Sequence, residues 1–315
     1  MPMSTPYISV LLPTWNGAET LSRMLPTLRE QAGLADRTVE ILALDSGSTD
    51  ATPALLDAHD VQWEPIDRRT FSHGGTRNEL ARRARGTFFV FMSQDVVPAD
   101  EHFLAGLVAP FEDDPQLAGA CARVLPFPDS DPLTARTVLD LPEASPEPSR
   151  RALDAVGSVW QVDALTRADY LRFNNVASAV RAEVFRSFPF PEVAFGEDFA
   201  WAARVLTAGH ALAHAPDAVA HHAHRYSPRE AYARYATDAS FHMAAHGWNM
   251  RPTLRSVLRG LAYELREDFA FVRAHGGASA LLRAPALRAA QVLGQFAGAR
   301  RDLVLDPNRS PKLVV

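Results

Sequence analysis

The segment ISVLLPTWNG, residues 8–17, decides the fold, together with EILALDSGSTD at 40–50 and FFVFMSQDVVP at 88–98. In each segment a short apolar run ends in a polar turn, and runs of this length are typical of buried strands. Helical patterns at 18–31, 52–59, 76–85 and 99–111 separate the runs. Strands that alternate with helices indicate an α/β fold. We therefore predict strands at 8–12, 40–44, 87–92 and 117–125.

The second half of the chain has a less regular pattern. Residues 126–150 are rich in Pro, Asp, Glu and Ser, which predicts a mobile loop that covers or accepts a substrate. FNNVASAVRAEVF at 173–185 is interpreted as a polar turn and an amphipathic helix, and GEDFAWAARVL at 196–206 as a helix that begins at an acidic pair. A last strand is expected at 211–223. From Ser227 the pattern is helical, so we predict two domains, 1–226 and 227–315.

Composition narrows the class of protein. Hydrophobic residues make up 47% of the 315 residues and charged residues 22%, as in soluble globular proteins. The chain contains no run of about 18 apolar residues that would predict a spanning helix. Its first residues lack the features of a signal peptide. Cys121 is the only cysteine, which excludes an internal disulfide and a cysteine-based zinc site. We expect a cytoplasmic protein.

The charge is unevenly distributed along the chain. Residues 225–315 carry 14 Lys and Arg against 7 Asp and Glu, a net charge of +7, whereas residues 1–224 have a net charge of −12. Apolar residues also recur at helical spacing between the arginines of this tail: Leu254, Val257, Leu258, Leu261 and Leu265. A basic amphipathic helix can lie on an anionic membrane surface, or it can pack on its own domain. Both interpretations stay open: peripheral contact with the inner face of a membrane, and a solvated helix face.

Three polar clusters follow three of the predicted strands, at Thr14–Gly17, Asp45–Asp50 and Ser93–Pro98. Ligands of open α/β sheets bind beyond the carboxyl ends of the strands, so these clusters are expected to converge on one crevice. Asp45 can accept hydrogen bonds from a nucleobase or ribose, or can form an Asx turn. Asp95 can share a divalent cation with phosphate oxygens, or can cap its own turn.

Two helix starts also carry groups suited to chemistry. Gly74 and Gly75 permit a sharp turn, after which Arg77 can meet a diphosphate; the alternative is a surface arginine behind a glycine turn. Glu197 and Asp198 begin a later helix, where a carboxylate can act as a general base toward a hydroxyl. Their alternative role is to cap that helix.

Three histidines, His221, His222 and His224, cluster just after the last predicted strand. Neutral imidazole is a ligand for divalent cations. No local spacing selects a zinc site, so partly exposed turn histidines are the alternative.

The motifs ISVLLPTWN, LDSGSTD, HGGTRN, SQD, GED and HAHRYS follow one another in an order that resembles family 2 inverting glycosyltransferases. The FSHGGTRN and SQD forms are similar to the rhamnosyltransferase branch. The resemblance spans about residues 7–227. It implies a GT-A fold, which is a Rossmann-like mixed sheet flanked by helices, followed here by a C-terminal helical extension.

The resemblance also implies roles for individual residues. A nucleotide-sugar donor, dTDP-rhamnose in this branch, would be bound by Thr14, Asn16, Asp45, Ser46, Arg77 and Gln94, with Arg77 near the diphosphate. Mg²⁺ or Mn²⁺ would be bound by Asp95 and His222, with His224 as the substitute for His222. Asp198, beside Glu197, would be the catalytic base. Ser93 stands where the commoner Asp-x-Asp motif has its first acid.

The expected acceptor is a hydroxyl of a glycan or a lipid-linked sugar in cell-surface polysaccharide synthesis, and no nucleic-acid partner is expected. Two alternatives remain at this point. A sugar-phosphate nucleotidyltransferase would use the same crevice, but its usual Lys- or Arg-rich phosphate loop near the N-terminus is missing, since Lys312 is the only lysine. A nucleotide-sugar or glycan-binding protein without turnover would not need both the Glu-Asp pair and the histidines.

Overall fold

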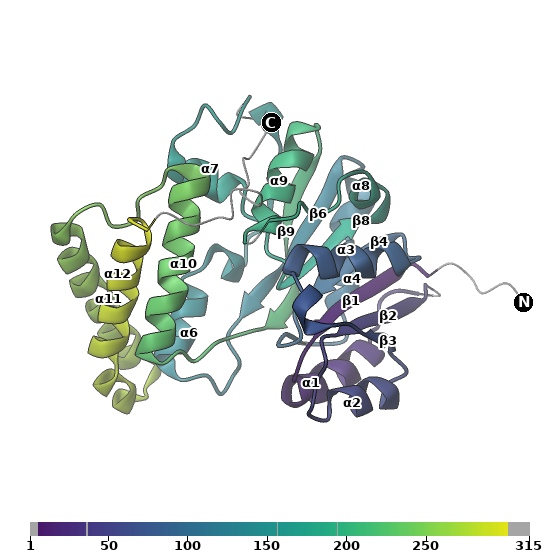
Figure 1. Ribbon diagram of the computed structural model, residues 1–315, viewed down its shortest axis with the longest axis horizontal. Helices are drawn as coiled ribbons and strands as arrows, with labels where there is room; N and C mark the ends of the chain where they lie inside the picture. Colours follow the sequence, from purple (N-terminus) through teal and green to yellow (C-terminus); the bar gives the residue numbers. More distant parts are fainter. Residues whose placement is uncertain (1–5, 36, 156, 194, 302–315) are drawn as a thin grey trace, which may run out of the picture.

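The computed structural model describes residues 6–301 apart from 36, 156 and 194 (Figure 1). Residues 1–5 and 302–315, the latter the end of the predicted helical extension, lie outside the described part. The described strands are β1 Ile8–Thr14, β2 Val39–Asp45, β3 Gln62–Pro65, β4 Phe88–Met92, β5 Val97–Pro98, β6 Leu117–Leu125, β7 Ser149–Arg151, β8 Ala177–Arg181 and β9 Ala211–His221. They form one sheet in the order β3-β2-β1-β4-β8-β6-β9-β5, with β7 also paired to β9.

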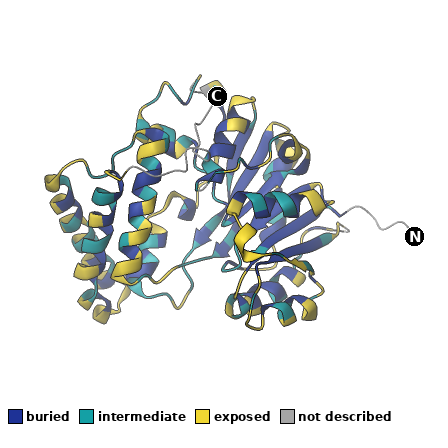
Figure 2. Ribbon diagram, viewed as in Figure 1, coloured by how far each residue is buried: buried dark blue, intermediate teal, exposed yellow. Residues whose placement is uncertain are grey.

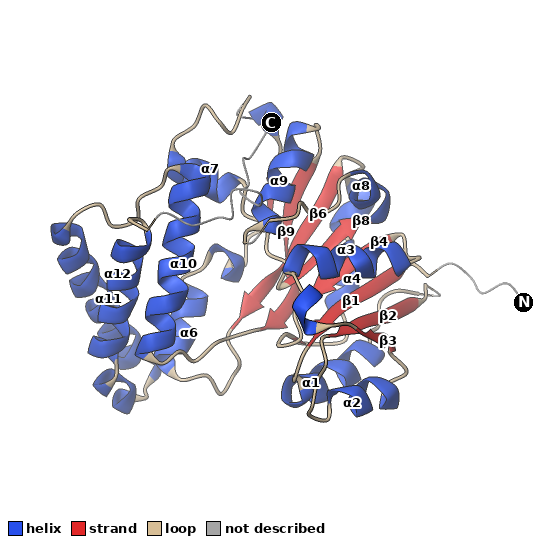
Figure 3. Cartoon of the chain, in the orientation of Figure 1, coloured by secondary structure: helices blue, strands red, loops and turns tan. Residues whose placement is uncertain are grey.

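The sheet is mixed, and its first half is parallel. β1 pairs in parallel with β2 and β4, and β2 with β3, whereas β8 is antiparallel to both β4 and β6 (Figure 3). Thr14 and Asp45 lie opposite each other at the carboxyl ends of β1 and β2. The predicted α/β fold with a mixed sheet flanked by helices is confirmed.

Helices cover both faces of the sheet. They are α1 Ala18–Arg29, α2 Thr52–Ala58, α3 His73–Arg83, α4 Phe103–Val108, α5 Pro110–Asp113, α6 Pro132–Leu139, α7 Ala164–Tyr170, α8 Ala182–Ser187, α9 Glu197–Thr207, α10 Pro228–His246, α11 Leu254–His275 and α12 Ala284–Gly298. Along β1 the side chains alternate, as the period of a strand requires: Ile8, Val10 and Leu12 belong to the core under α1 and α4, and Leu11 to the core under α3 and α9. The strands β1, β2 and β4 are therefore buried on both faces (Figure 2).

Two predictions for the middle of the chain are wrong. Residues 126–150 are not one mobile loop, because they contain α6, which is capped by Asp131 through a hydrogen bond from Leu133 N to its side chain at 3.2 Å. An amphipathic helix was predicted after the polar turn at 173. The structure instead has the strand β8 there, between β4 and β6, and the short helix α8 follows it. The short strand β3 has no apolar run and was not expected from the sequence.

The C-terminal helices α10, α11 and α12 pack together on the side of the molecule away from β1–β3 (Figure 1). α10 begins at the capping box of Ser227 and Glu230 that the sequence indicates. A buried cluster of charges ties these helices to α6: the carboxylate of Asp268 accepts hydrogen bonds from Arg136 Nε at 2.7 Å and Arg288 Nη2 at 2.8 Å. A helical extension is therefore present, and its division from 1–226 as a separate domain stays a prediction. No helix among the described residues combines the length and apolarity needed to cross a bilayer.

Candidate active site

The turn after β2 is organised around Asp45, which is 2% exposed. Its carboxylate accepts hydrogen bonds from Thr14 Oγ1 at 3.0 Å, from Ser48 Oγ at 2.6 Å, and from the backbone amides of residues 47 and 48 at 3.0 and 2.7 Å. The Asx turn considered from the sequence is thus present. Gly47 has a φ of +81°, in the left-handed region that favours glycine. The nucleoside contact of Asp45 stays a prediction.

The turns after β1, β2 and β4 are joined by side chains. Thr49 N donates to Asn16 Oδ1 at 2.8 Å, and Asn16 N donates to Ser48 Oγ at 2.7 Å. Gln94 joins the third turn to the first, because its amide group both accepts from Trp15 N at 2.7 Å and donates to Trp15 O at 2.9 Å. The predicted convergence of the three clusters is therefore present in the structure.

Ser46 is 3% exposed, and its Oγ has no hydrogen-bond partner among the described residues. A buried hydroxyl without a partner is uncommon. The contact of Ser46 with a donor stays a prediction.

Asp95, His222 and His224 form the second group. Their ligand atoms all lie within 4.8 Å of one another, and Asp95 Oδ2 is 3.4 Å from His222 Nε2 and 3.5 Å from His224 Nε2. Burial acts to raise the pKa of Asp95, but the hydrogen bond from His222 and the proximity of His222 and His224 together outweigh it, so the pKa is lowered. His221 is separate from the group, since its Nδ1 lies 2.8 Å from Pro126 O.

The third group is the acidic pair at the start of α9. Gly196, with a φ of +78°, turns the chain into the helix. Burial, and secondarily the neighbouring Glu197 carboxylate, raise the pKa of Asp198 to about 7. Asp198 Oδ1 accepts only a local hydrogen bond, from Phe199 N at 2.9 Å, among the described residues. This carboxyl can therefore take up or release a proton near neutral pH.

Arg77 lies beside Glu197, where the sequence alone did not place it. Its Nη1 donates to Glu197 Oε1 at 2.8 Å, and its Nη2 is 3.5 Å from the carbonyl oxygen of Asn175. Arg77 is 5% exposed, so it is not the surface arginine of the alternative interpretation. Its contact with a diphosphate stays a prediction.

Residues 175–176 connect the acidic pair to the Asp95 turn. The carbonyl of Asn175 faces Arg77, and the next carbonyl, that of Val176, accepts a hydrogen bond from Ser93 N at 2.9 Å. The Gln94–Trp15 bonds then lead to Asp45. Hydrogen bonds through the turn 93–95 thus link the three groups of candidate residues, which come from segments far apart in the chain.

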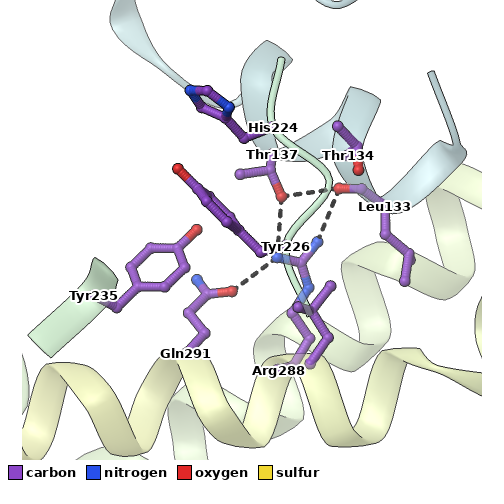
Figure 4. Close-up of a pocket in the computed structure, with 9 residues that line it drawn as sticks. Leu133, Thr134, Thr137, His224, Tyr226, Tyr235, Arg288 and Gln291 are labelled. Atoms are coloured by element: carbon purple, nitrogen blue, oxygen red, sulfur yellow. Dashed lines mark hydrogen bonds between the residues drawn. The ribbon is translucent and has the colours of Figure 1, made fainter. Parts of the chain in front are cut away.

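A small hollow lies next to His224, between α6, α10 and α12 (Figure 4). The side chains of Tyr226 and Tyr235 both line it. The buried Arg288 forms part of its wall and donates hydrogen bonds to Gln291 and Thr137 at 2.8 and 3.1 Å. Sequence analysis missed this hollow, as it missed Asn175 and Ser48. Ser48 had a signal, since it belongs to the LDSGSTD motif, whereas the two tyrosines are brought together only by tertiary packing.

Comparisons with known proteins show the family and the fold of this chain. The family model described as Glycosyl transferase family 2 matches residues 9–164. The chain is 30% identical over 249 residues to the O-antigen chain rhamnosyltransferase RfbN of Salmonella typhimurium, covering 78% of this chain and 74% of that protein. It is 27% identical over 250 residues to the O-antigen chain rhamnosyltransferase WbaN of Salmonella anatum, covering 78% and 75%.

Solved structures share the fold. The mannosyltransferase PcManGT from Pyrobaculum calidifontis, in complex with GDP-Man and Mn²⁺, aligns with a TM-score of 0.58 at 19% identity over 96% of this chain and 88% of that one. Residues 1–349 of S. aureus TarS align with a TM-score of 0.53 at 16% identity over 93% and 90%. The fold and the grouped motifs define a glycosyltransferase of the GT-A type. The chain belongs to glycosyltransferase family 2 and is similar to its O-antigen rhamnosyltransferases.

Proposed function

We propose that this glycosyltransferase moves rhamnose from dTDP-rhamnose to a hydroxyl of a glycan or lipid-linked acceptor, with inversion at the anomeric carbon. The observation that supports the proposal is that hydrogen bonds through the turn 93–95 link the turn after β1, the Asp95 group and the ion pair of Arg77 with Glu197. The rhamnose donor is supported by the similarity to RfbN and WbaN.

In this proposal the donor lies at the carboxyl ends of β1, β2 and β4. Thr14 and Asp45 shape the turn, while the unpartnered hydroxyl of Ser46 and the polar groups of Asn16 and Gln94 bind the nucleoside and the first phosphate. Hydroxyl and amide groups offer the donors and acceptors that a base and a ribose need.

The residues present fit a divalent cation. Asp95 offers an ionised carboxylate, and His222 and His224 offer imidazole nitrogens within 4.8 Å of it and of each other. Carboxylate suits Mg²⁺ and Mn²⁺, and imidazole also binds Mn²⁺, the cation present in the PcManGT complex. When bound, such a cation supplies positive charge to a diphosphate.

Asp198 is the proposed general base. It takes the proton from the acceptor hydroxyl as that oxygen attacks the anomeric carbon, the bond from that carbon to the diphosphate oxygen breaks, and the nucleoside diphosphate leaves. A pKa of about 7 suits this role, because the carboxylate is ionised above neutral pH yet basic enough to accept a proton.

The decisive experiment mixes the enzyme and Mn²⁺ with a panel of nucleotide sugars and an acceptor glycan, and measures released nucleoside diphosphate. The proposal expects release from dTDP-rhamnose above the other donors. A nucleotidyltransferase would instead consume nucleoside triphosphate with a sugar phosphate, and a binding protein would shift its melting temperature with donor without releasing any product.

The membrane contact is proposed on the outer face of α11. Leu254 and Leu258, one turn apart, are 67% and 68% exposed, whereas Val257 between them is buried. Arg255 and Arg259 are exposed on the same stretch, and neither forms a salt bridge within the described part of the chain. Exposed apolar side chains flanked by arginines fit an anionic lipid surface, which would place the enzyme at the cytoplasmic face.

Co-sedimentation with phosphatidylcholine vesicles, with and without phosphatidylglycerol, tests this contact. Binding is expected only to the anionic vesicles and should be lost in the Leu254→Ser, Leu258→Ser double variant. Leu165→Ser, an exposed leucine on α7, is the matched control. Equal sedimentation of wild type and the double variant would remove the membrane proposal.

A further inference from the structure

Arg77 and Glu197 form a buried ion pair across 120 residues of sequence, with 2.8 Å between Nη1 and Oε1. The two side chains are 6% and 10% exposed. Each charge is therefore stabilised mainly by the other, because burial removes the water that would otherwise solvate it and few other polar groups take the place of that water. Arg77 Nε has no hydrogen-bond partner among the described residues, so Glu197 is the main partner of this guanidinium.

The pair lies where α3 and the start of α9 approach each other closely. A Cβ added at Gly74, in the first turn of α3, would lie 3.2 Å from Pro191 O and 3.4 Å from Glu197 Cβ. On the other side, a Cβ at Gly196 would overlap the ring of Phe241 from α10. The start of α9 is thus enclosed by α3 and α10, and the ion pair is its polar link to α3.

Asp198 follows Glu197 directly and experiences both charges. The Glu197 carboxylate acts to raise the pKa of Asp198, and the Arg77 guanidinium acts to lower it. Other ionisable groups lie nearby: His73 on α3 is influenced by Arg77, Glu197 and Arg234, and the thiol of Cys121 on β6 by Asp198. Arg77 and Glu197 are therefore placed to act on Asp198 in opposite directions.

We propose that Arg77 and Glu197 are positioning residues, whose buried ion pair holds the start of α9 and balances the charge beside Asp198 without touching the substrate. This inference rests on the proposed role of Asp198 as base. It assigns to Arg77 a role other than contact with the diphosphate, and to Glu197 a role other than catalysis.

The test compares Arg77→Met, Glu197→Gln and the double variant with wild type. The pKa of Asp198 is followed by carboxyl carbon-13 NMR, assigned with Asp198→Asn, and the acidic limb of kcat/KM is measured in parallel. NMR is needed because the pKa of His73 also responds to Arg77. Arg82→Met is the matched control, since Arg82 lies on the same helix with its side chain 71% exposed.

We expect Arg77→Met to move both readouts to higher pH and Glu197→Gln to lower pH, each by about one pH unit or more. Both readouts of the double variant should return toward the wild-type values, and those of Arg82→Met should not shift. Donor KM should stay within about twofold in all of these variants, because the proposal has neither side chain touching the substrate. Arg77→Lys should restore part of the wild-type value.

Different failures have different meanings. Shifts in the same direction, or none, in folded variants would overturn the ion-pair inference, and folding is checked by circular dichroism. A large rise in donor KM for Arg77→Met alone would return Arg77 to the diphosphate. If wild type transfers no sugar, the proposed function fails, while the NMR shifts still decide whether the pair controls Asp198.

Discussion

Asp95 and Asp198 are the same residue type in the candidate site, but their surroundings shift their pKa values in opposite directions. Two imidazoles lie within 3.5 Å of the Asp95 carboxylate and lower its pKa despite burial. Asp198 has no cationic hydrogen-bond partner among the described residues, and burial with Glu197 raises its pKa to about 7. Carboxyls whose pKa values are separated in this way commonly divide the work of a site, one staying ionised and one exchanging protons. Asp95 is suited to a cation, and Asp198 to a proton.

The largest expected effect comes from removing the proton acceptor. Asp198→Asn keeps the shape of the side chain but not its basicity, so turnover should fall by about 10²–10⁴-fold. Donor affinity measured by calorimetry should hardly change, because the base acts on the acceptor.

Asp238→Asn provides a demanding control for that variant. Burial also raises the pKa of Asp238, which lies 3.2 Å from Arg234 on α10. Its loss should reduce turnover by less than about tenfold if it is not the base. A larger loss in Asp238→Asn than in Asp198→Asn would reverse the assignment.

The second effect concerns the cation. His222→Ala removes one of three candidate ligands and should weaken the apparent affinity for Mn²⁺ by about 10–100-fold, the range seen even for groups that only support a ligand. Activity should return at high Mn²⁺ concentration. His221→Ala is the neighbouring control, because the His221 ring contacts Pro126 O instead. Equal Mn²⁺ affinity in wild type and His222→Ala would show that His222 is not a ligand of the cation.

The sequence predicted the parts of this comparison that depend on local pattern. β4, Phe88–Met92, is apolar throughout because it is buried on both faces, and it leads directly to Asp95. β8 was missed because ASAVR has no strong strand pattern and is fixed as a strand by pairing with β4 and β6. The ion pair between Arg77 and Glu197 could not be predicted from the sequence either, because the packing of α3 against α9 brings these two residues together and their spacing in the sequence does not indicate it.

The smallest effect is on stability, and its sign follows from linkage. The pKa of Asp198 is about 7 in the folded protein and near 3.8 in the unfolded chain. The folded state therefore binds this proton more tightly, so the contribution of Asp198 to stability is fully present below pH 3.8 and is lost as pH rises toward 7. The asparagine side chain in Asp198→Asn does not titrate. The free energy of unfolding of this variant should therefore increase relative to that of wild type as pH rises over that window, by about 1–2 kcal/mol after allowance for the partial exposure of Asp198.

Urea unfolding of wild type and Asp198→Asn at several pH values between 5 and 8 measures this difference, and Asp95→Asn gives the contrast. The lowered pKa of Asp95 means that its contribution is present above its unfolded pKa and is lost only in acid. The loss of the Asp95 contribution therefore lies below that range, whereas the stability difference for Asp198→Asn should rise with pH through about 7 and level off above it. If the stability difference for Asp198→Asn did not change between pH 5 and 8, the pKa of Asp198 would not be raised by its surroundings, and the proton-accepting role would lose its physical basis.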